Sequence, residues 1–264
     1  MKQVVVVLSL LLIMAATAYA GPPLYTDDAG TVDVGRMEIE LNGSHIYDRE
    51  RSNGISVRRD AVAGEARLTT GLCKNLGISL ALLYTFSDRT TEDGNLTGRA
   101  DGFGDMAVEL KYAFAELAGI AFAVKPSVIM PTGNYNAGLS DIRWQLGGAL
   151  IATREFDEGA YAMHANLGYD HHDYRTEQTR VSNHNNLWFG SLAGEAKVSK
   201  DLTAVTEFGL SKTQDKTTNK LTGFAQVGAR YELNKHLDIN AGLKLGLTKP
   251  EDDLTIRYGL VLKF

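Results

Sequence analysis

Apolar and polar side chains alternate with a period of two along nearly the whole chain, in segments of about 10 to 14 residues. This period is typical of β-strands, and the segments exceed the mean strand length of soluble proteins, roughly 5 to 6 residues. About 9 to 11 tilted residues are enough for a strand to cross a bilayer. Beyond the first twenty residues no apolar stretch is long enough for a membrane-spanning helix. A closed β-barrel is the other structure that can pair every backbone N–H and C=O within a membrane.

The connections between the alternating segments predict how such a barrel is oriented. After the even-numbered segments they are tight, and after the odd-numbered ones they are mostly longer and more polar, as at residues 48–54, 88–105 and 131–141. Outer-membrane barrels have short periplasmic turns and longer external loops around an even number of strands. We therefore predict an all-β fold, a transmembrane antiparallel β-barrel of 12 strands over residues 36–264. Counts of 11 or 14 strands fit this alternation less well, and a soluble sandwich is the weakest alternative.

The first twenty residues have the pattern of a secretory signal peptide. Lys2 precedes an apolar run from Val4 to about Ala16, and Ala18 and Ala20 form an A-x-A cleavage site. Such a segment is removed from the mature protein. Residues 1–20 are therefore predicted to be a cleaved signal, and residues 21–35 a periplasmic lead-in to the barrel.

Net charge and cysteine content indicate two features that the protein is not expected to have, nucleic-acid binding and a disulfide within the chain. The formal net charge is −5, which does not favour nucleic-acid binding. The single cysteine, Cys73, cannot form a disulfide within the chain, and we assign it no role. No cofactor is implied.

In a membrane barrel the apolar face of each strand meets lipid, so the opposite, polar face lines the lumen. Charged residues recur on that opposite face in most of the alternating segments. The candidates for lining the lumen are Glu38, Glu40, Glu65, Arg67, Glu109, Lys111, Arg143, Glu207, Arg230, Lys244, Arg257. Acidic and basic side chains occur in similar number, so they could either line an open path or pair across the lumen and close it.

Three segments resemble a known family: residues 22–42 with their Thr-Asp-Asp start, residues 102–114 with Gly-Phe-Gly-Asp before a strand, and residues 126–139 with Pro-Thr-Gly after one. They are similar to the outer-membrane transporters named for the meta-pathway of phenol degradation. The resemblance implies a single barrel that moves small aromatic or other hydrophobic compounds. It assigns no functional residue.

The segment Tyr25-Thr26-Asp27-Asp28 precedes the first strand and has two possible roles. It could enter the lumen as a partial plug or gate. The alternative, which we favour from sequence, is a periplasmic lead-in whose Asp side chains cap a turn.

Two further sites were considered at the outer end of the barrel. His172 and His184 flank one long loop and could, with a neighbouring carboxylate, bind Zn²⁺ or Cu²⁺, but their spacing matches no defined metal motif. A lipid hydrolase would need a serine paired with a histidine such as His45 or His164, and no such arrangement stands out. We therefore expect no metal and no enzyme.

The last eleven residues, 254–264, alternate strictly and end on an aromatic residue. If they form the final strand, they must pair with the first to leave no edge in the bilayer. The signal for recognition by the barrel-insertion machinery is expected at Tyr258, Leu260, Leu262, Phe264.

These features together predict a monomeric channel in the bacterial outer membrane. It would allow passive uptake of small, hydrophobic or aromatic solutes, with outer-membrane lipid around it. The alternative is a non-transporting barrel, either structural or lipid-hydrolysing.

Overall fold

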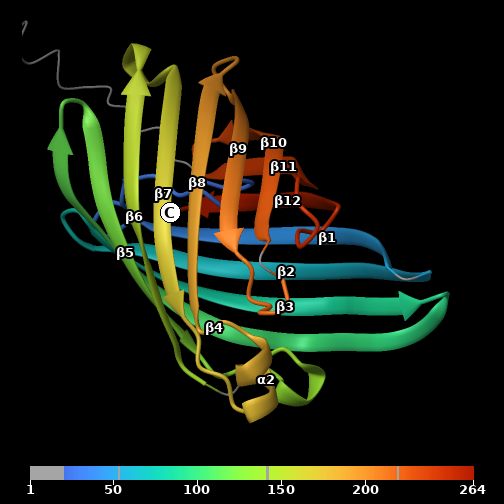
Figure 1. Ribbon diagram of the computed structural model, residues 1–264. Coiled ribbons are helices and arrows are strands. Elements are labelled where there is room, and N and C mark those ends of the chain that lie inside the picture. Colours follow the sequence, from blue (N-terminus) through green and yellow to red (C-terminus); the bar gives the residue numbers. More distant parts are fainter. Residues whose placement is uncertain (1–20, 53, 141–142, 219) are drawn as a thin grey trace, which may run out of the picture.

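The computed structural model describes residues 21–52, 54–140, 143–218 and 220–264; the predicted signal peptide lies outside the described residues. In these ranges twelve antiparallel strands form one closed barrel, as predicted (Figure 1). The strands are β1 (Met37–Ser52), β2 (Ile55–Cys73), β3 (Leu76–Glu92), β4 (Asn95–Leu117), β5 (Ile120–Met130), β6 (Gln145–Phe156), β7 (Tyr161–His171), β8 (Asn186–Lys197), β9 (Leu202–Lys212), β10 (Leu221–Asn234), β11 (Leu237–Gly246) and β12 (Leu254–Lys263). The short helical segments are η1 (Tyr135–Ala137), η2 (Asp157–Gly159) and α2 (Glu177–Ser182).

The first and last strands close the barrel. Glu38 lies opposite Lys263 and Tyr47 opposite Leu254 in the β1–β12 ladder. The pairing continues past the end of β12, where the backbone N–H of Phe264 donates to the carbonyl oxygen of Met37 at 2.9 Å. The prediction that the C-terminal segment pairs with the first strand is therefore confirmed, and the sheet has no open edge.

The two faces of the barrel wall have opposite character. Apolar side chains on the outer face are exposed, among them Phe208 at 59% and Leu210 at 50%. Polar side chains on the inner face are buried, with Glu207 at 0% and Gln226 at 1% exposure. A soluble protein buries its apolar residues instead, so this inversion is the arrangement of a barrel whose outer surface meets lipid.

Two connections predicted as long loops are strands in the structure. Most of residues 88–105 extends the β3–β4 hairpin, and β1 continues through residues 48–52. The β3–β4 hairpin turns at Asp93 and Gly94, whose φ angles are 46° and 84°. Asp-Gly is a favoured pair for such a turn, and it was the signal in the sequence. The alternation could not reveal these strand ends because both of their faces are largely polar.

The β7–β8 connection packs against the β9–β10 connection at the end opposite to the short turns. Tyr174 is fully buried there, and its hydroxyl donates to the carbonyl oxygen of His184 at 2.8 Å. The N–H of His184 in turn donates to the carbonyl oxygen of Gln214 at 2.7 Å. No helix in the described ranges is long and apolar enough to cross a membrane.

Candidate functional site

Most of the N-terminal segment, residues 21–35, lies within the barrel and contacts its inner face, whereas residues 33–35 are exposed. We name residues 21–35 the plug segment. Thr26 and Asp28 are each only 2% exposed. The N–H and the hydroxyl of Thr26 both donate to Glu207 Oε1, at 2.7 and 2.6 Å, and the N–H of Tyr25 donates to Glu207 Oε2 at 2.9 Å. One inward-facing carboxylate of β9 therefore accepts three hydrogen bonds from the segment. This corrects the expected lead-in outside the barrel, since the chain enters the lumen before β1 begins.

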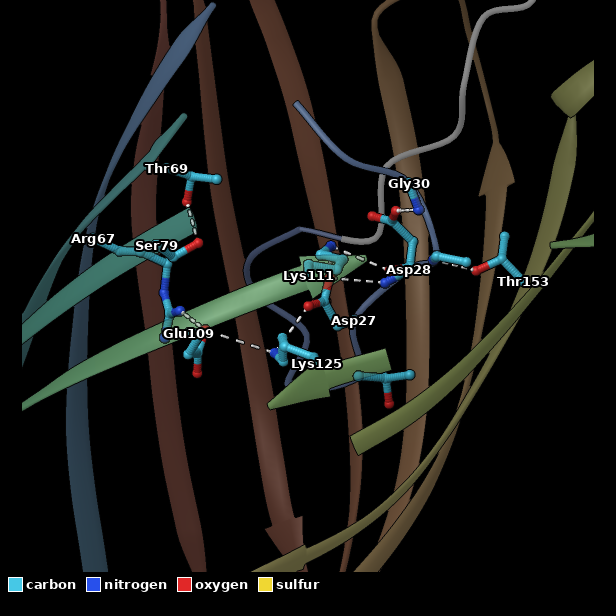
Figure 2. A network of polar contacts seen from close by, with 12 residues as sticks. Asp27, Asp28, Gly30, Arg67, Thr69, Ser79, Glu109, Lys111, Lys125 and Thr153 are labelled. Atoms are coloured by element: carbon cyan, nitrogen blue, oxygen red, sulfur yellow. Dashed lines mark hydrogen bonds and ion pairs between the residues drawn. The ribbon is translucent and has the colours of Figure 1, made fainter. Parts of the chain in front are cut away.

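Asp27 is held between two lysines of the barrel wall. Its carboxylate oxygens lie 2.7 Å from Lys111 Nζ on β4 and 2.9 Å from Lys125 Nζ on β5 (Figure 2). Burial alone would raise the pKa of Asp27, but the two ammonium groups outweigh it and hold the pKa below its usual range. Asp27 is therefore a partly buried anion that anchors the segment to two neighbouring strands.

The ion pairs continue from Asp27 along the inner wall. Lys125 Nζ is also 3.8 Å from Glu109 Oε2. Glu109 forms a short ion pair with Arg67, and the Nε of Arg67 is 3.2 Å from Glu65 on its own strand. Charges of both signs thus neutralise one another from the plug segment across β5, β4 and β2 (Figure 2).

Asp28 has a different environment from Asp27 although the two are adjacent. Its carboxylate accepts the N–H of Gly30 at 2.5 Å, a turn contact of the kind expected from sequence. Burial, together with the negative charges of Asp27 and Glu195, raises the pKa of Asp28 to about 7 against the opposing effect of Lys111. Of these two adjacent carboxyl groups, Asp27 therefore stays ionised and Asp28 titrates near neutral pH.

Further contacts tie the segment to the opposite wall. The carbonyl oxygen of Pro23 accepts hydrogen bonds from Gln226 Nε2 at 2.6 Å and from Arg257 Nη1 at 2.5 Å. The N–H of Ala29 donates to Thr153 Oγ1 at 2.9 Å. With the contacts above, the segment is bonded to strands β4, β5, β6, β9, β10 and β12.

A cavity of about 420 Å³ lies on one side of the segment. Gly159, Lys200 and Asp201 line it, and these residues belong to short connections. The cavity is therefore in the half of the lumen next to the short turns. Its walls carry acidic and basic side chains in similar number, and several pair with each other, as Arg230 does with Glu195 at 2.8 Å and Lys263 with Asp238 at 2.6 Å.

Most of the predicted lumen residues line this cavity: Glu38, Glu40, Glu65, Arg67, Glu109, Lys111, Arg230, Arg257. Glu207 instead lies beneath Thr26, and Lys244 pairs with Glu251 at 2.5 Å near the other end. Arg143 does not lie on the barrel wall, because β6 begins two residues later, and its guanidinium is 3.7 Å from the carboxylate of Asp173 in a neighbouring connection.

Aromatic side chains also face the lumen, which the sequence did not reveal. The ring of Tyr25 packs edge-on against Phe224 at 5.4 Å and lies over the guanidinium of Arg257 at 3.7 Å. Lys244 Nζ is 5.3 Å from the centre of the Phe224 ring. Phe224 lies two residues before the buried Gln226 and is therefore on the same, inner face of β10. This spacing was the feature of the sequence that could have predicted its position.

His172 and His184, the candidate metal ligands, both lie in the β7–β8 connection. The N–H of His172 donates to the carbonyl oxygen of Asn185, and His184 contacts Gln214. Within the part of the chain that the structure describes, no group of three or more His, Cys, Asp or Glu side chains could hold a metal ion. His164 is buried in the barrel wall, with Nδ1 3.0 Å from Thr153 Oγ1.

Solved structures with the same fold are outer-membrane barrels. The COG4313 outer membrane channel from Pseudomonas putida F1 matches with a TM-score of 0.73 and 18% identity, over 92% of this chain and 99% of that one. The NanC porin matches with a TM-score of 0.57 and 12% identity, over 86% and 100%. The KdgM porin matches with a TM-score of 0.53 and 10% identity, over 85% and 98%.

At these identities the structures establish the fold alone. No curated protein matches the chain by sequence. A family profile, in contrast, matches residues 48–264, which is most of the chain. The chain belongs to the family described as "Putative MetA-pathway of phenol degradation".

Proposed function

We propose that the protein is an outer-membrane channel for passive uptake of small hydrophobic or aromatic solutes, and that residues 21–35 form its gate. The observation that carries the proposal is the position of this plug segment. It is bonded to strands on opposite sides of the barrel and has the charged cavity on one side. A lumen of twelve strands is wider than that of an eight-stranded barrel, which side chains alone just fill. Removing the plug segment would therefore leave a continuous path.

The character of the lumen supports an aromatic or hydrophobic solute. Tyr25 of the plug segment lines the cavity and packs against Phe224, whose ring also faces the lumen, and Phe189 packs against the buried cluster that includes Ala29. Apolar and aromatic walls with a few polar groups are what small-molecule sites typically use. The family description, which refers to phenol degradation, points to the same class of solute.

The gate is held by contacts that can be broken without unfolding the barrel. The bonds of Asp27 and Thr26 join the plug segment to the wall, whereas the barrel closes through its own ladders. The plug segment can therefore leave the lumen while the backbone hydrogen bonds of the sheet remain.

A flux panel in liposomes tests the proposal. The parent protein and a variant lacking residues 22–30 are reconstituted, and the entry of phenol, benzoate, a fatty acid and glucose is compared. We expect the parent to admit phenol faster than protein-free liposomes do, and the deletion variant to admit every small solute faster than the parent. A folded deletion variant that leaks no solute above the protein-free rate would contradict the channel and favour a non-transporting barrel.

A further inference from the structure

Strands β1 to β4 are longer than a membrane requires. They contain 16, 19, 17 and 23 residues, whereas about 9 to 11 tilted residues cross the hydrocarbon layer. The excess lies at the end with the longer connections, where β3 and β4 form an extended hairpin (Figure 1). This part of the wall therefore stands outside the hydrocarbon region.

Register shows which residues share the outer face of these extended ends. Leu41 of β1 lies opposite Ala66 of β2, on the apolar outer face, and Arg49 lies eight residues further along the same face, opposite Arg58. Asp60, two residues from Arg58, lies opposite Arg89 of β3. Arg89 in turn lies opposite Arg99 of β4. Directly opposed residues share a face, so these arginines form a row around the outside of the wall. We name Arg49, Arg51, Arg58, Arg89 and Arg99 the arginine row.

The arginine row has more positive charge than its surroundings neutralise. All five side chains are exposed. Arg58 is 3.6 Å from Asp60 and Arg99 is 3.5 Å from Asp101. Within the described residues, no carboxylate lies within ion-pair distance of the guanidinium groups of Arg49, Arg51 and Arg89, although the backbone N–H of Arg49 donates to Asp253 Oδ2 at 3.1 Å. Two of the cross-strand pairs, Arg49 with Arg58 and Arg89 with Arg99, bring like charges together, which destabilises a sheet.

Acidic residues are concentrated on the opposite, concave face of the same strand ends. Asp48 lies opposite Arg59, and Glu50 lies opposite Val57, which in turn faces Glu92. Arg59 pairs there with Asp88 at 2.8 Å. Most basic residues of these strand ends therefore lie on the outer face and most acidic residues on the concave face, although the two kinds are similar in number. An excess of positive charge confined to one face is the pattern of a surface that binds an anion.

Aromatic residues mark the level at which the arginine row begins. Tyr84 packs against Phe86 and Phe103 with ring centres 5.0 and 4.8 Å apart. These rings lie between the apolar residues of β3 and Arg89, and Phe86 is 63% exposed. Aromatic girdles lie at the boundary between hydrocarbon and head groups. The arginine row therefore faces the level of the lipid head groups in the outer leaflet.

We propose that the arginine row binds the phosphorylated sugar head group of the outer-leaflet glycolipid, lipopolysaccharide. The planar guanidinium of arginine binds phosphate through two parallel hydrogen bonds, which the ammonium group of lysine does not offer. The bound phosphates would also relieve the repulsion within the two opposed arginine pairs. This inference rests on the proposed outer-membrane location but not on solute passage.

Binding of lipopolysaccharide to the whole protein in zwitterionic nanodiscs tests the proposal. The test variant carries Arg49→Gln, Arg58→Gln, Arg89→Gln and Arg99→Gln. The control variant removes four exposed basic residues at the other end of the barrel: Arg36→Gln, Lys74→Gln, Arg154→Gln, Lys235→Gln. We expect the test variant to bind at least tenfold more weakly than the parent, and the control variant to stay within twofold.

Two further arms make the result specific. The parent is expected to bind dephosphorylated glycolipid at least tenfold more weakly than the phosphorylated form. Heat-modifiable gel mobility confirms folding, and if the fourfold variant does not fold, the pair variants Arg49→Gln/Arg58→Gln and Arg89→Gln/Arg99→Gln are each expected to bind at least threefold more weakly. Folded arginine variants that bind like the parent, or equal binding of the dephosphorylated lipid, would overturn the proposal. Phenol flux measured on the same variants reports separately on the channel.

Discussion

Replacing Asp27 with Asn should release the plug segment. Asp27 neutralises Lys111 and Lys125, whose side chains are only 19% and 20% exposed. Removing one partner of a buried ion pair typically costs about 3 to 5 kcal/mol, because the remaining charge is left uncompensated. Here each lysine keeps a weaker partner: the carbonyl oxygen of Asp28 at 3.2 Å for Lys111, and Glu109 at 3.8 Å for Lys125. We therefore expect Asp27→Asn to weaken docking of the plug segment by about 2 to 3 kcal/mol, at or below the lower end of that range.

That cost applies to docking of the plug segment, because the barrel ladders are unchanged. At 1.4 kcal/mol for each factor of ten, it shifts the equilibrium between docked and released segment by roughly 30- to 150-fold. Single-channel recordings in planar bilayers measure the ratio of open to closed time, which should rise by this factor for Asp27→Asn. The matched control is Asp101→Asn, which removes an ion pair of 3.5 Å between side chains that are both more than half exposed. Asp27→Asn channels whose open fraction equals that of both parent and control would refute the reasoning.

Three other predictions follow from the same contacts. Burial raises the pKa of Asp28 to about 7, so the docked segment keeps a proton that the released segment loses above about pH 4. As the pH rises from about 4 to 7, docking should therefore weaken and the open fraction of the channel should rise. Asp28→Asn should remove this pH dependence in single-channel recordings over the same range. A Cβ at Gly71 would lie 2.3 Å from the carbonyl oxygen of Val32. Gly71→Ala should therefore weaken docking of the plug segment by about 1 to 3 kcal/mol and raise the ion conductance. An unchanged conductance would contradict this contact. Deleting Phe264 removes two backbone hydrogen bonds to Met37, whereas Phe264→Ala keeps them. If the aromatic side chain is the insertion signal, both changes should lower the yield of heat-modifiable barrel equally. If the hydrogen bonds that close the barrel contribute more, the deletion should give the lower yield.

The fold was predictable from sequence because a membrane barrel repeats one simple rule. Each strand must present alternate apolar residues to lipid. This pattern was enough to predict even the last strand, which has Leu254 and Leu260 on one face and Thr255 and Val261 on the other. This alternation is required only where a strand crosses the hydrocarbon layer. Arg89 and Arg99 lie on strands, but neither face there meets hydrocarbon, so apolar and polar residues do not alternate and a loop was predicted.

The site was predictable only in part. Period two assigns Lys111 to the inner face, but it does not say which group lies across the lumen. The contact between Lys111 and Asp27 joins residues 84 positions apart through a segment that has no strand pattern of its own. Two adjacent aspartates also gave no hint that Asp27 would bind lysines while Asp28 capped a turn, because burial and neighbouring charge decide between these roles.

The most direct test of the gate is to lock it. Thr26 Oγ1 lies 2.7 Å from Ser191 Oγ of β8, so Thr26→Cys and Ser191→Cys, in a background in which the exposed Cys73 is replaced by Ser, place two thiols in position to form a disulfide. Phenol entry into liposomes is then measured for the same preparation, oxidised and reduced. We expect phenol entry to fall to the protein-free rate on oxidation and to return on reduction. Equal entry in both states would contradict the claim that the plug segment gates the lumen.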